Sequence, residues 1–249
     1  MLLENRTVLI TGASRGIGAA TARLAARHGA TVAVNYFQSE KAAAEVVDEI
    51  TSAGGRAMAV RADVREPGEV LAMKEQVSAE LGPVDTLVIN ASMTFPVVPF
   101  VDFQWGAFEA KLVGELKAAF FCCKVFVPPM IEAGGGTVIG VSSGLSRRPG
   151  FGFCAHTTAK SGLDGFMKSL ALELGPRGIR VNVVSPGLTE TDATANIPVE
   201  NKEAARRMTP LGRVGQPEDI AGAIVLMAAE EAGFVTGAYL PVSGGTLML

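Results

Sequence analysis

The chain has 249 residues, of which 48% are hydrophobic and 6% aromatic, so it can bury a large aliphatic core, and this composition argues against disorder. Its formal net charge of -3 and its lack of a basic cluster remove the electrostatic case for a nucleic-acid or anionic-membrane partner. No apolar run approaches the length of a membrane span and residues 1–6 carry no signal pattern, which indicates a cytoplasmic location.

No linker, charge block or internal repeat divides the chain, so one nucleotide-binding domain over residues 1–249 is expected. The three cysteines are odd in number and have no metal-type spacing, which predicts free thiols and no metal site. Cys122 and Cys123 fall in an apolar helical run, so we expect both in the core.

Short apolar runs alternate with longer amphipathic segments along the chain. Continuous apolar strands are typical of a parallel sheet covered on both faces, and the segments between them are long enough for helical crossovers. The pattern predicts an α/β fold with a doubly wound parallel sheet of the Rossmann type, in which ligands bind beyond the carboxyl ends of the strands. The predicted strands cover residues 7–10, 31–35, 57–61, 86–89, 137–141 and 180–184.

A glycine-rich turn, Thr11-Gly12-Ala13-Ser14-Arg15-Gly16-Ile17-Gly18, follows the first predicted strand and opens an Ala-rich helical pattern. Gly12 allows a tight turn, Gly16 removes a side chain where a phosphate must approach, and Gly18 lets the helix pack close to the sheet. The free N–H groups at the start of the helix then face an anion. The turn predicts a dinucleotide pyrophosphate site made by Gly12, Ser14, Arg15, Gly16, Ile17 and Gly18.

This G-x-x-x-G-x-G spacing resembles the short-chain dehydrogenase/reductase family, and its 3-oxoacyl-carrier-protein reductase branch in particular, over essentially the whole chain. The resemblance implies a nicotinamide cofactor. It implies further contacts from Asp63 and Val64 to adenine and from Asn90 and Ala91 beside the adenine ribose. Residues 186–191 resemble the family's Pro-Gly-x-x-x-Thr element, so Pro186, Gly187 and the final threonine, Thr191, are expected at the nicotinamide and phosphates, with Thr189 as a second contact.

The second predicted strand ends without the acidic side chain that would hold the ribose hydroxyls of NAD. This omission favours NADP(H). Arg15 can meet a 2′-phosphate, Asn35 and Ser39 can add neutral hydrogen bonds, and Tyr36 stands where NAD-specific members of the family have Asp. The alternative is that Arg15 is a solvated loop residue and that the cofactor preference is lax.

Carbonyl reduction requires a hydride from the cofactor and a hydrogen-bond donor and acid at the oxygen. Ser143, after the fifth predicted strand, can be the donor. Thirteen residues later the family has Tyr, followed four residues on by Lys on the same helix face, whereas this chain has His156 and Lys160. By resemblance, Lys160 holds the nicotinamide ribose.

Imidazole can replace the phenol in acid/base work, since its ordinary pKa of about 6.5 lies near working pH, and a nearby Lys160 favours its neutral form. The shorter ring calls for a bridging water or a different substrate pose. A second departure is Glu115, which stands where the family has the Asn of a proton relay. Glu115 either holds the relay water or pairs with Lys160.

These features predict an NADP(H)-dependent oxidoreductase of the ketoreductase or alcohol-dehydrogenase type, with Ser143, His156, Lys160 and Glu115 as catalytic residues. The pH dependence is expected nearer neutrality than that of a tyrosine enzyme. Two alternatives stay open: a cofactor-binding scaffold or regulatory protein without turnover, and a non-redox dehydratase or isomerase in the same cleft.

The predicted substrate is a small carbonyl or alcohol compound, with acyl-carrier-bound and polyketide-like molecules among the options. Its walls are expected from residues 92–100, 144–153 and 188–207, where four phenylalanines either contact an apolar ligand or pack the loops. These are Phe95, Phe100, Phe151 and Phe153. The resemblance also implies a homotetramer or homodimer formed through residues 104–131, residues 155–174 and the last strand.

Overall fold

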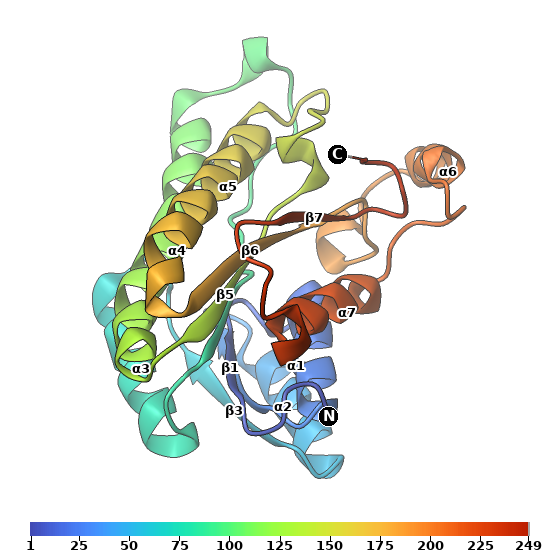
Figure 1. The fold of residues 1–249 in the computed structure, drawn as a ribbon. Coiled ribbons are helices and arrows are strands. Elements are labelled where there is room, and N and C mark those ends of the chain that lie inside the picture. Colours follow the sequence, from blue (N-terminus) through green and yellow to red (C-terminus); the bar gives the residue numbers. More distant parts are fainter. Residues whose placement is uncertain (249) are drawn as a thin grey trace.

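The computed structural model describes residues 1–248 and places seven parallel strands in one sheet of order β3-β2-β1-β4-β5-β6-β7 (Figure 1). This confirms the predicted doubly wound α/β fold. The six predicted strands are present with small shifts at their ends, and a seventh strand forms one edge of the sheet. The strands are β1 (Thr7–Ile10), β2 (Thr31–Tyr36), β3 (Arg56–Arg61), β4 (Thr86–Ile89), β5 (Gly136–Val141), β6 (Ile179–Pro186) and β7 (Tyr239–Val242).

Helices cover both faces of the sheet, because successive residues of each buried strand point to opposite sides. In β1, Leu9 packs into one hydrophobic cluster while Val8 and Ile10 pack into the other. The first cluster lies under α3 (Pro67–Leu81), α4 (Trp105–Glu132) and α5 (Cys154–Leu174). The second lies under α1 (Gly16–Arg27), α2 (Glu40–Ser52) and α7 (Pro217–Ala228), while α6 (Val199–Met208) stands apart from both layers (Figure 1).

The two adjacent cysteines lie in the core on α4, as predicted. Cys122 and Cys123 are free thiols, and burial raises the pKa of both, that of Cys122 to about 12. A thiol with a raised pKa is a poor nucleophile, so we give these residues a packing role.

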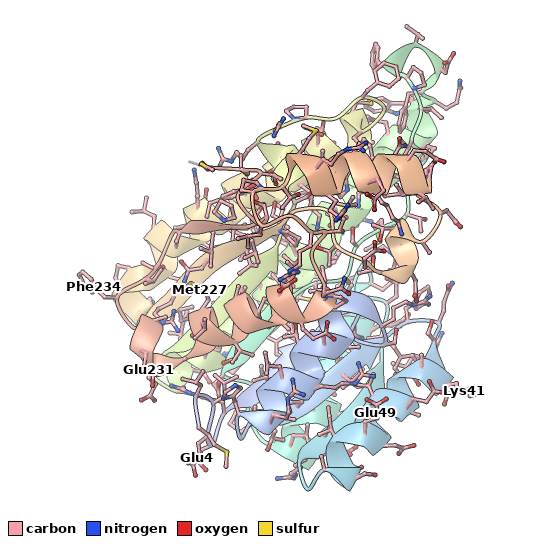
Figure 2. All side chains as sticks on the ribbon, turned by 90° about the vertical axis from the view of Figure 1, so that its right-hand side faces the viewer. Glu4, Lys41, Glu49, Met227, Glu231 and Phe234 are labelled. Atoms are coloured by element: carbon pink, nitrogen blue, oxygen red, sulfur yellow. The ribbon has the colours of Figure 1, made fainter. Side chains whose placement is uncertain are left out.

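On the side of the molecule that carries α1, α2 and α7, the labelled charged side chains Glu4, Lys41, Glu49 and Glu231 project outward (Figure 2). Within residues 1–248, none of the helices combines the length and the apolarity needed to cross a bilayer.

Candidate active site

The turn between β1 and α1 forms a cradle in which three of the eight residues 11–18 are glycines. Gly12 and Gly16 have φ angles of 61° and 55°, in the left-handed region that favours glycine. A Cβ on Gly12 would lie 2.9 Å from the Cα of Ala91, and one on Gly18 would lie 2.6 Å from Nδ2 of Asn90. No side chain caps the start of α1 at Arg15, so its first N–H groups remain available to an anion. Ser14 and Ile17 lie in the same turn, and the whole cradle fits a dinucleotide pyrophosphate.

Two asparagine side chains brace this cradle from below. Asn90 Nδ2 donates to the carbonyl oxygens of Thr11 and Gly12 at 2.9 and 3.1 Å. Asn35 is buried; its Oδ1 accepts from Gly12 N at 3.1 Å, and its Nδ2 donates to Val60 O and Ala62 O. Because its amide is fully engaged inside the protein, Asn35 supports the turn and is not the phosphate-facing donor that the sequence suggested.

Positive charge gathers at the end of β2. Arg15 hydrogen-bonds to Ser39, and its guanidinium is 3.8 Å from the exposed carboxylate of Asp192. Arg61 and Arg65 lie over the ring of Phe37, with their guanidinium carbons 5.8 and 5.6 Å from its centroid. Sequence reasoning missed these two arginines; the register of β3 beside β2 places Arg61 opposite Tyr36, and Arg65 follows the end of β3.

The other residues expected near adenosine are mostly occupied within the protein. Tyr36 is buried in the core cluster. The carboxylate of Asp63 is held by Arg65 Nε at 2.8 Å, and the hydrogen bonds from Arg65 outweigh partial burial and lower the pKa of Asp63. Contacts of Asp63, Val64 and Ala91 with adenosine stay predictions.

The segment after β6 crosses above the glycine turn. A Cβ on Gly187 would lie 2.9 Å from the Cα of Ser243, and the buried Thr189 hydroxyl donates to Gly187 O. Thr191 is the residue nearest the turn: a Cβ on Gly16 would meet its Cγ2 at 3.4 Å. The segment that begins at Pro186 therefore brings Thr191 to the pyrophosphate cradle. Thr191 is the threonine of the Pro-Gly-x-x-x-Thr spacing, and a contact from Thr189, the second one expected, stays a prediction.

Three charged side chains meet between α4 and α5. Glu115 lies with Oε1 2.5 Å from Lys160 Nζ and Oε2 2.6 Å from Lys111 Nζ, and all three residues are buried. Lys160 also donates to Val141 O at 2.8 Å. An ammonium has three donors, so Lys160 retains capacity for a ribose hydroxyl. Of the two roles considered for Glu115, the structure shows the pairing with Lys160.

The charges of this cluster decide its protonation. Burial alone would raise the pKa of Glu115, but the positive charges of Lys160 and Lys111 outweigh burial and lower it. Burial lowers the pKa of Lys111 more than Glu115 raises it. The cluster therefore holds one carboxylate between two cations. Sequence reasoning missed Lys111, although its i,i+4 spacing from Glu115 on an apolar helix was a usable signal.

His156 projects from α5 into an aromatic setting. The ring of Phe95 stacks on the imidazole with centroids 4.7 Å apart and planes at 19°, and Phe153 approaches edge-on at 6.4 Å. Burial, followed by the positive charges of Lys160 and Lys111, lowers the pKa of His156 to about 3. This lowered pKa favours the neutral imidazole near pH 7, and the pH dependence expected for turnover stays a prediction.

Two of the four candidate phenylalanines therefore pack around the site. Phe95 and Phe153 lie against His156, whereas Phe100 and Phe151 are 78% and 86% exposed. The loops that carry them are adjacent, since a Cβ on Gly152 would lie 3.1 Å from Val97 Cγ1. These contacts place residues 92–100 and 144–153 side by side, as expected for two walls of one cleft.

Ser143 follows β5 and is held by one hydrogen bond at its side chain and one at its carbonyl oxygen. Its Oγ accepts from Leu145 N at 3.2 Å, which leaves the hydroxyl hydrogen free to donate to a substrate oxygen. Its carbonyl oxygen accepts from the Tyr239 hydroxyl at 3.1 Å, and that hydroxyl also meets Ser185 Oγ at 2.7 Å. Tyr239 is thus close to Ser143 in space, but its hydroxyl is engaged.

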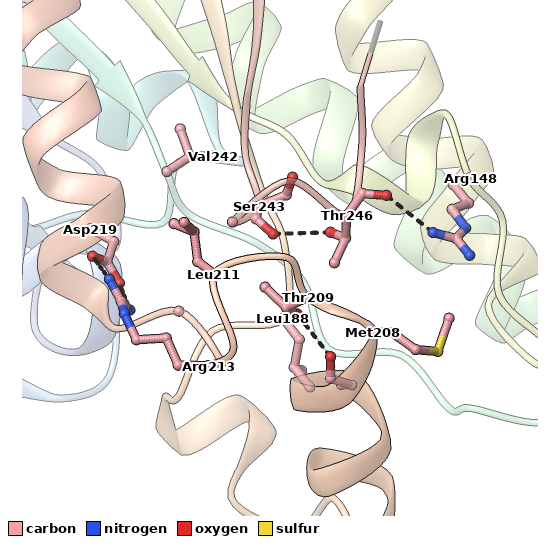
Figure 3. A pocket seen from close by; sticks show the side chains of 13 residues that line it. Arg148, Leu188, Met208, Thr209, Leu211, Arg213, Asp219, Val242, Ser243 and Thr246 are labelled. Atoms are coloured by element: carbon pink, nitrogen blue, oxygen red, sulfur yellow. Dashed lines mark hydrogen bonds and ion pairs between the residues drawn. The ribbon is translucent and has the colours of Figure 1, made fainter.

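A separate cavity of about 360 Å³ lies between α6 and the C-terminal segment (Figure 3). None of the four predicted catalytic residues lines it. Leu188 and Ala205 line it, so part of the predicted wall 188–207 faces this cavity. Arg148 reaches across it to donate to Thr246 O, as Figure 3 shows.

The chain is similar to known dehydrogenases and reductases along its whole length. A family model described as "Enoyl-(Acyl carrier protein) reductase" matches residues 12–246. L-rhamnose 1-dehydrogenase (NAD(P)(+)) of Sphingomonas sp. (strain SKA58) is 42% identical over 248 residues, which cover 98% of this chain and 97% of that protein. A 3-oxoacyl-[acyl-carrier-protein] reductase of Synechocystis sp. is 37% identical, with 99% and 98% covered. A structure of 7α-hydroxysteroid dehydrogenase with NADH and 7-oxo glycochenodeoxycholic acid matches at a TM-score of 0.93 and 33% identity, over 98% of this chain and 94% of that one.

Proposed function

Because this chain belongs to the short-chain dehydrogenase/reductase family, we propose that it is an NADP(H)-dependent oxidoreductase that moves a hydride between nicotinamide and a carbonyl or secondary alcohol. The observation that carries the proposal is the buried Lys160, which keeps a free donor at the end of β5 and shares a face of α5 with His156. Nicotinamide supplies or accepts the hydride when it is bound.

The cofactor preference is proposed from charge at the end of β2. Arg15 is the guanidinium nearest the glycine turn, and its only carboxylate neighbour among the described residues, Asp192, is exposed. A 2′-phosphate would gain a charge-assisted hydrogen bond from Arg15 and a neutral one from Ser39. This strand end has no acidic side chain that could accept hydrogen bonds from the ribose hydroxyls of NAD. The names of the similar proteins mention both NAD(P) and NADH, so this preference rests on the site itself.

We assign His156 the role of a hydrogen-bond donor and not that of a cationic acid. Its lowered pKa keeps the ring neutral, and a neutral imidazole can polarise a carbonyl through its single N–H. The hydroxyl of Ser143 gives a second hydrogen bond to the same oxygen. Lys160 adds positive potential where negative charge develops on that oxygen. His156 keeps its N–H hydrogen, so the proton that completes the alcohol comes from a water molecule, which leaves as hydroxide.

A cofactor-binding protein without turnover is the second candidate. The same lowered pKa of His156 favours it, because an imidazole that is not protonated near pH 7 cannot deliver a proton as readily as an imidazolium. A non-redox enzyme that cycles a proton through His156 is disfavoured for the same reason.

The deciding experiment measures NADPH consumption with β-keto thioesters, diketones and polycyclic ketones, for the parent, His156→Ala and His156→Tyr. We expect turnover by the parent and a loss of about a hundredfold in His156→Ala. A silent parent whose activity is restored by His156→Tyr would establish the binding role instead. An alanine variant as active as the parent would remove His156 from the mechanism.

The cofactor preference is tested by titrating NADPH and NADH into the parent and Arg15→Ala. We expect tighter binding of NADPH and a loss of about tenfold in Arg15→Ala for NADPH alone. Arg23→Ala, which removes an exposed guanidinium paired with Glu49, is the matched control. Equal losses for both cofactors would reject the phosphate contact.

A homo-oligomer is proposed from the exposed apolar side chains of the α4–α5 layer. Trp105 and Phe120 on α4 are 69% and 50% exposed, and Leu172 on α5 is 82% exposed. Large apolar groups on adjoining helices are typical of a buried interface. Light scattering is expected to give a dimer or tetramer, and a monomer would reject the proposal.

A further inference from the structure

The segment after β4 runs from the cofactor cradle to His156 and is fixed by Lys111. Lys111 is 0% exposed, and its Nζ donates to Ser92 Oγ and to Met93 O, both at 2.8 Å. Its third partner is Glu115 at 2.6 Å. The three donors of this ammonium are thus satisfied, and two of them hold the segment directly.

Phe95 lies on that segment and is the closest aromatic neighbour of His156. Its ring stacks on the imidazole at 4.7 Å, and Lys111 Nζ lies 5.0 Å from the centroid of the same ring. A cation near an aromatic ring adds attraction to the packing. One side chain therefore contacts both the imidazole and the buried ammonium.

The imidazole depends on this packing for its orientation. Nδ1 of His156 is buried and has no hydrogen-bond partner among the described residues. The χ2 torsion of histidine is broad and roughly two-fold, so a ring without a hydrogen bond at Nδ1 is oriented by its neighbours alone. A tyrosine, which carries its hydroxyl on the ring axis, would not change the position of that group when the ring flips.

We propose that Phe95 and Lys111 are positioning residues for His156: Lys111 fixes the segment after β4, and Phe95 on that segment holds the plane of the imidazole. The catalytic consequence rests on the proposed function, whereas the orientation itself does not. Neither residue contacts the reacting atoms. Their effect is to limit the rotation of one neutral ring about its χ2 torsion.

The first arm of the test is a double-mutant cycle with NADPH turnover as the readout. We expect Phe95→Leu and Lys111→Met each to lower kcat about tenfold while the KM for NADPH stays within about twofold. In a His156→Ala background neither substitution has a ring left to orient, so the further loss should fall below about twofold. Phe234→Leu and Lys117→Met remove exposed side chains of the same types and are the controls. Additive losses would overturn the proposal.

The second arm reads the ring directly by nitrogen-15 NMR of the imidazoles near pH 7. His28 is the only other histidine in the sequence and gives an internal reference. We expect relaxation of the His156 ring signals to report a rigid ring in the parent, and faster ring motion in Phe95→Leu and Lys111→Met. Parent signals retained in both variants would overturn the proposal. A silent parent with the expected NMR change would reject the proposed function and keep the positioning role.

Discussion

The glycine turn is made of main chain, and the site between α4 and α5 is made of charged side chains, although both lie beyond the carboxyl ends of neighbouring strands. At the turn, an added Cβ on Gly12 or Gly18 would clash with Ala91 or Asn90, and the proposed pyrophosphate site relies on N–H groups already fixed by the fold. Between α4 and α5, Glu115 offsets the desolvation of two lysines. We therefore expect the glycine turn to be sensitive to an added Cβ atom, and the site between α4 and α5 to be sensitive to the loss of a charge.

The largest expected effect is at the charged end. Glu115→Ala leaves Lys111 and Lys160 buried without a counter-ion, which should lower the free energy of unfolding by about 3–5 kcal/mol. Adding Lys111→Met removes one of the two uncompensated charges and should restore part of the loss. Urea unfolding measures both.

The control for this prediction is Glu49→Ala, which breaks the exposed pair with Arg23 and should cost about 0–1 kcal/mol. A loss in Glu115→Ala no larger than that of the control would show that the buried lysines are neutral or well hydrated. The contrast between the two ends would then disappear.

The turn end is tested by Gly18→Ala. The added Cβ would lie 2.6 Å from Asn90 Nδ2 and 2.7 Å from Gly12 O, so the turn must shift, at a cost of about 1–3 kcal/mol in stability. NADPH affinity should fall with it, because the N–H groups that face the pyrophosphate move. Gly68→Ala on α3, where a Cβ meets nothing within 4 Å, should change neither quantity. Unaltered NADPH binding in Gly18→Ala would contradict the cradle.

The features that the sequence predicted are those specified by neighbouring residues, and the features that it missed depend on contacts between distant segments. The glycine turn and the strands were readable because each is specified by neighbouring residues. The hydrogen bonds of Asn35 were not, since they depend on the register of β2 beside β3. Lys111 was missed because its partners come from the segment after β4. The neutral state of His156 followed from Lys160, but its extent depends on burial under Phe95, which no local pattern encodes.

The charged end should also make the protein sensitive to acid. The pKa of His156 is about 3 in the folded state and about 6.5 when unfolded, so the unfolded chain binds more protons between these values. Stability contributed by the neutral ring is present above pH 6.5 and is lost as the pH falls toward 3, by up to about 1.4 kcal/mol per pH unit. Urea unfolding at several pH values should show a steeper acid loss for the parent than for His156→Gln. His28→Gln should follow the parent, and identical slopes for all three would refute the assignment.

The smallest expected effect concerns Tyr239, which joins β7 to the catalytic end through neutral hydrogen bonds. Tyr239→Phe removes the donor to Ser143 O and the contacts with Ser146 and Ser185, while the guanidinium of Arg147 can stay 4.8 Å from the ring centroid. We expect a loss of about 1 kcal/mol in stability and a few-fold lower kcat with unchanged NADPH affinity. Ser169→Ala, which removes an exposed hydroxyl that bonds to Gly165 O on α5, is the control. If Tyr239→Phe instead matched Glu115→Ala in cost, neutral hydrogen bonds would matter at the catalytic end as much as charge, since Phe keeps the ring and loses only the hydroxyl.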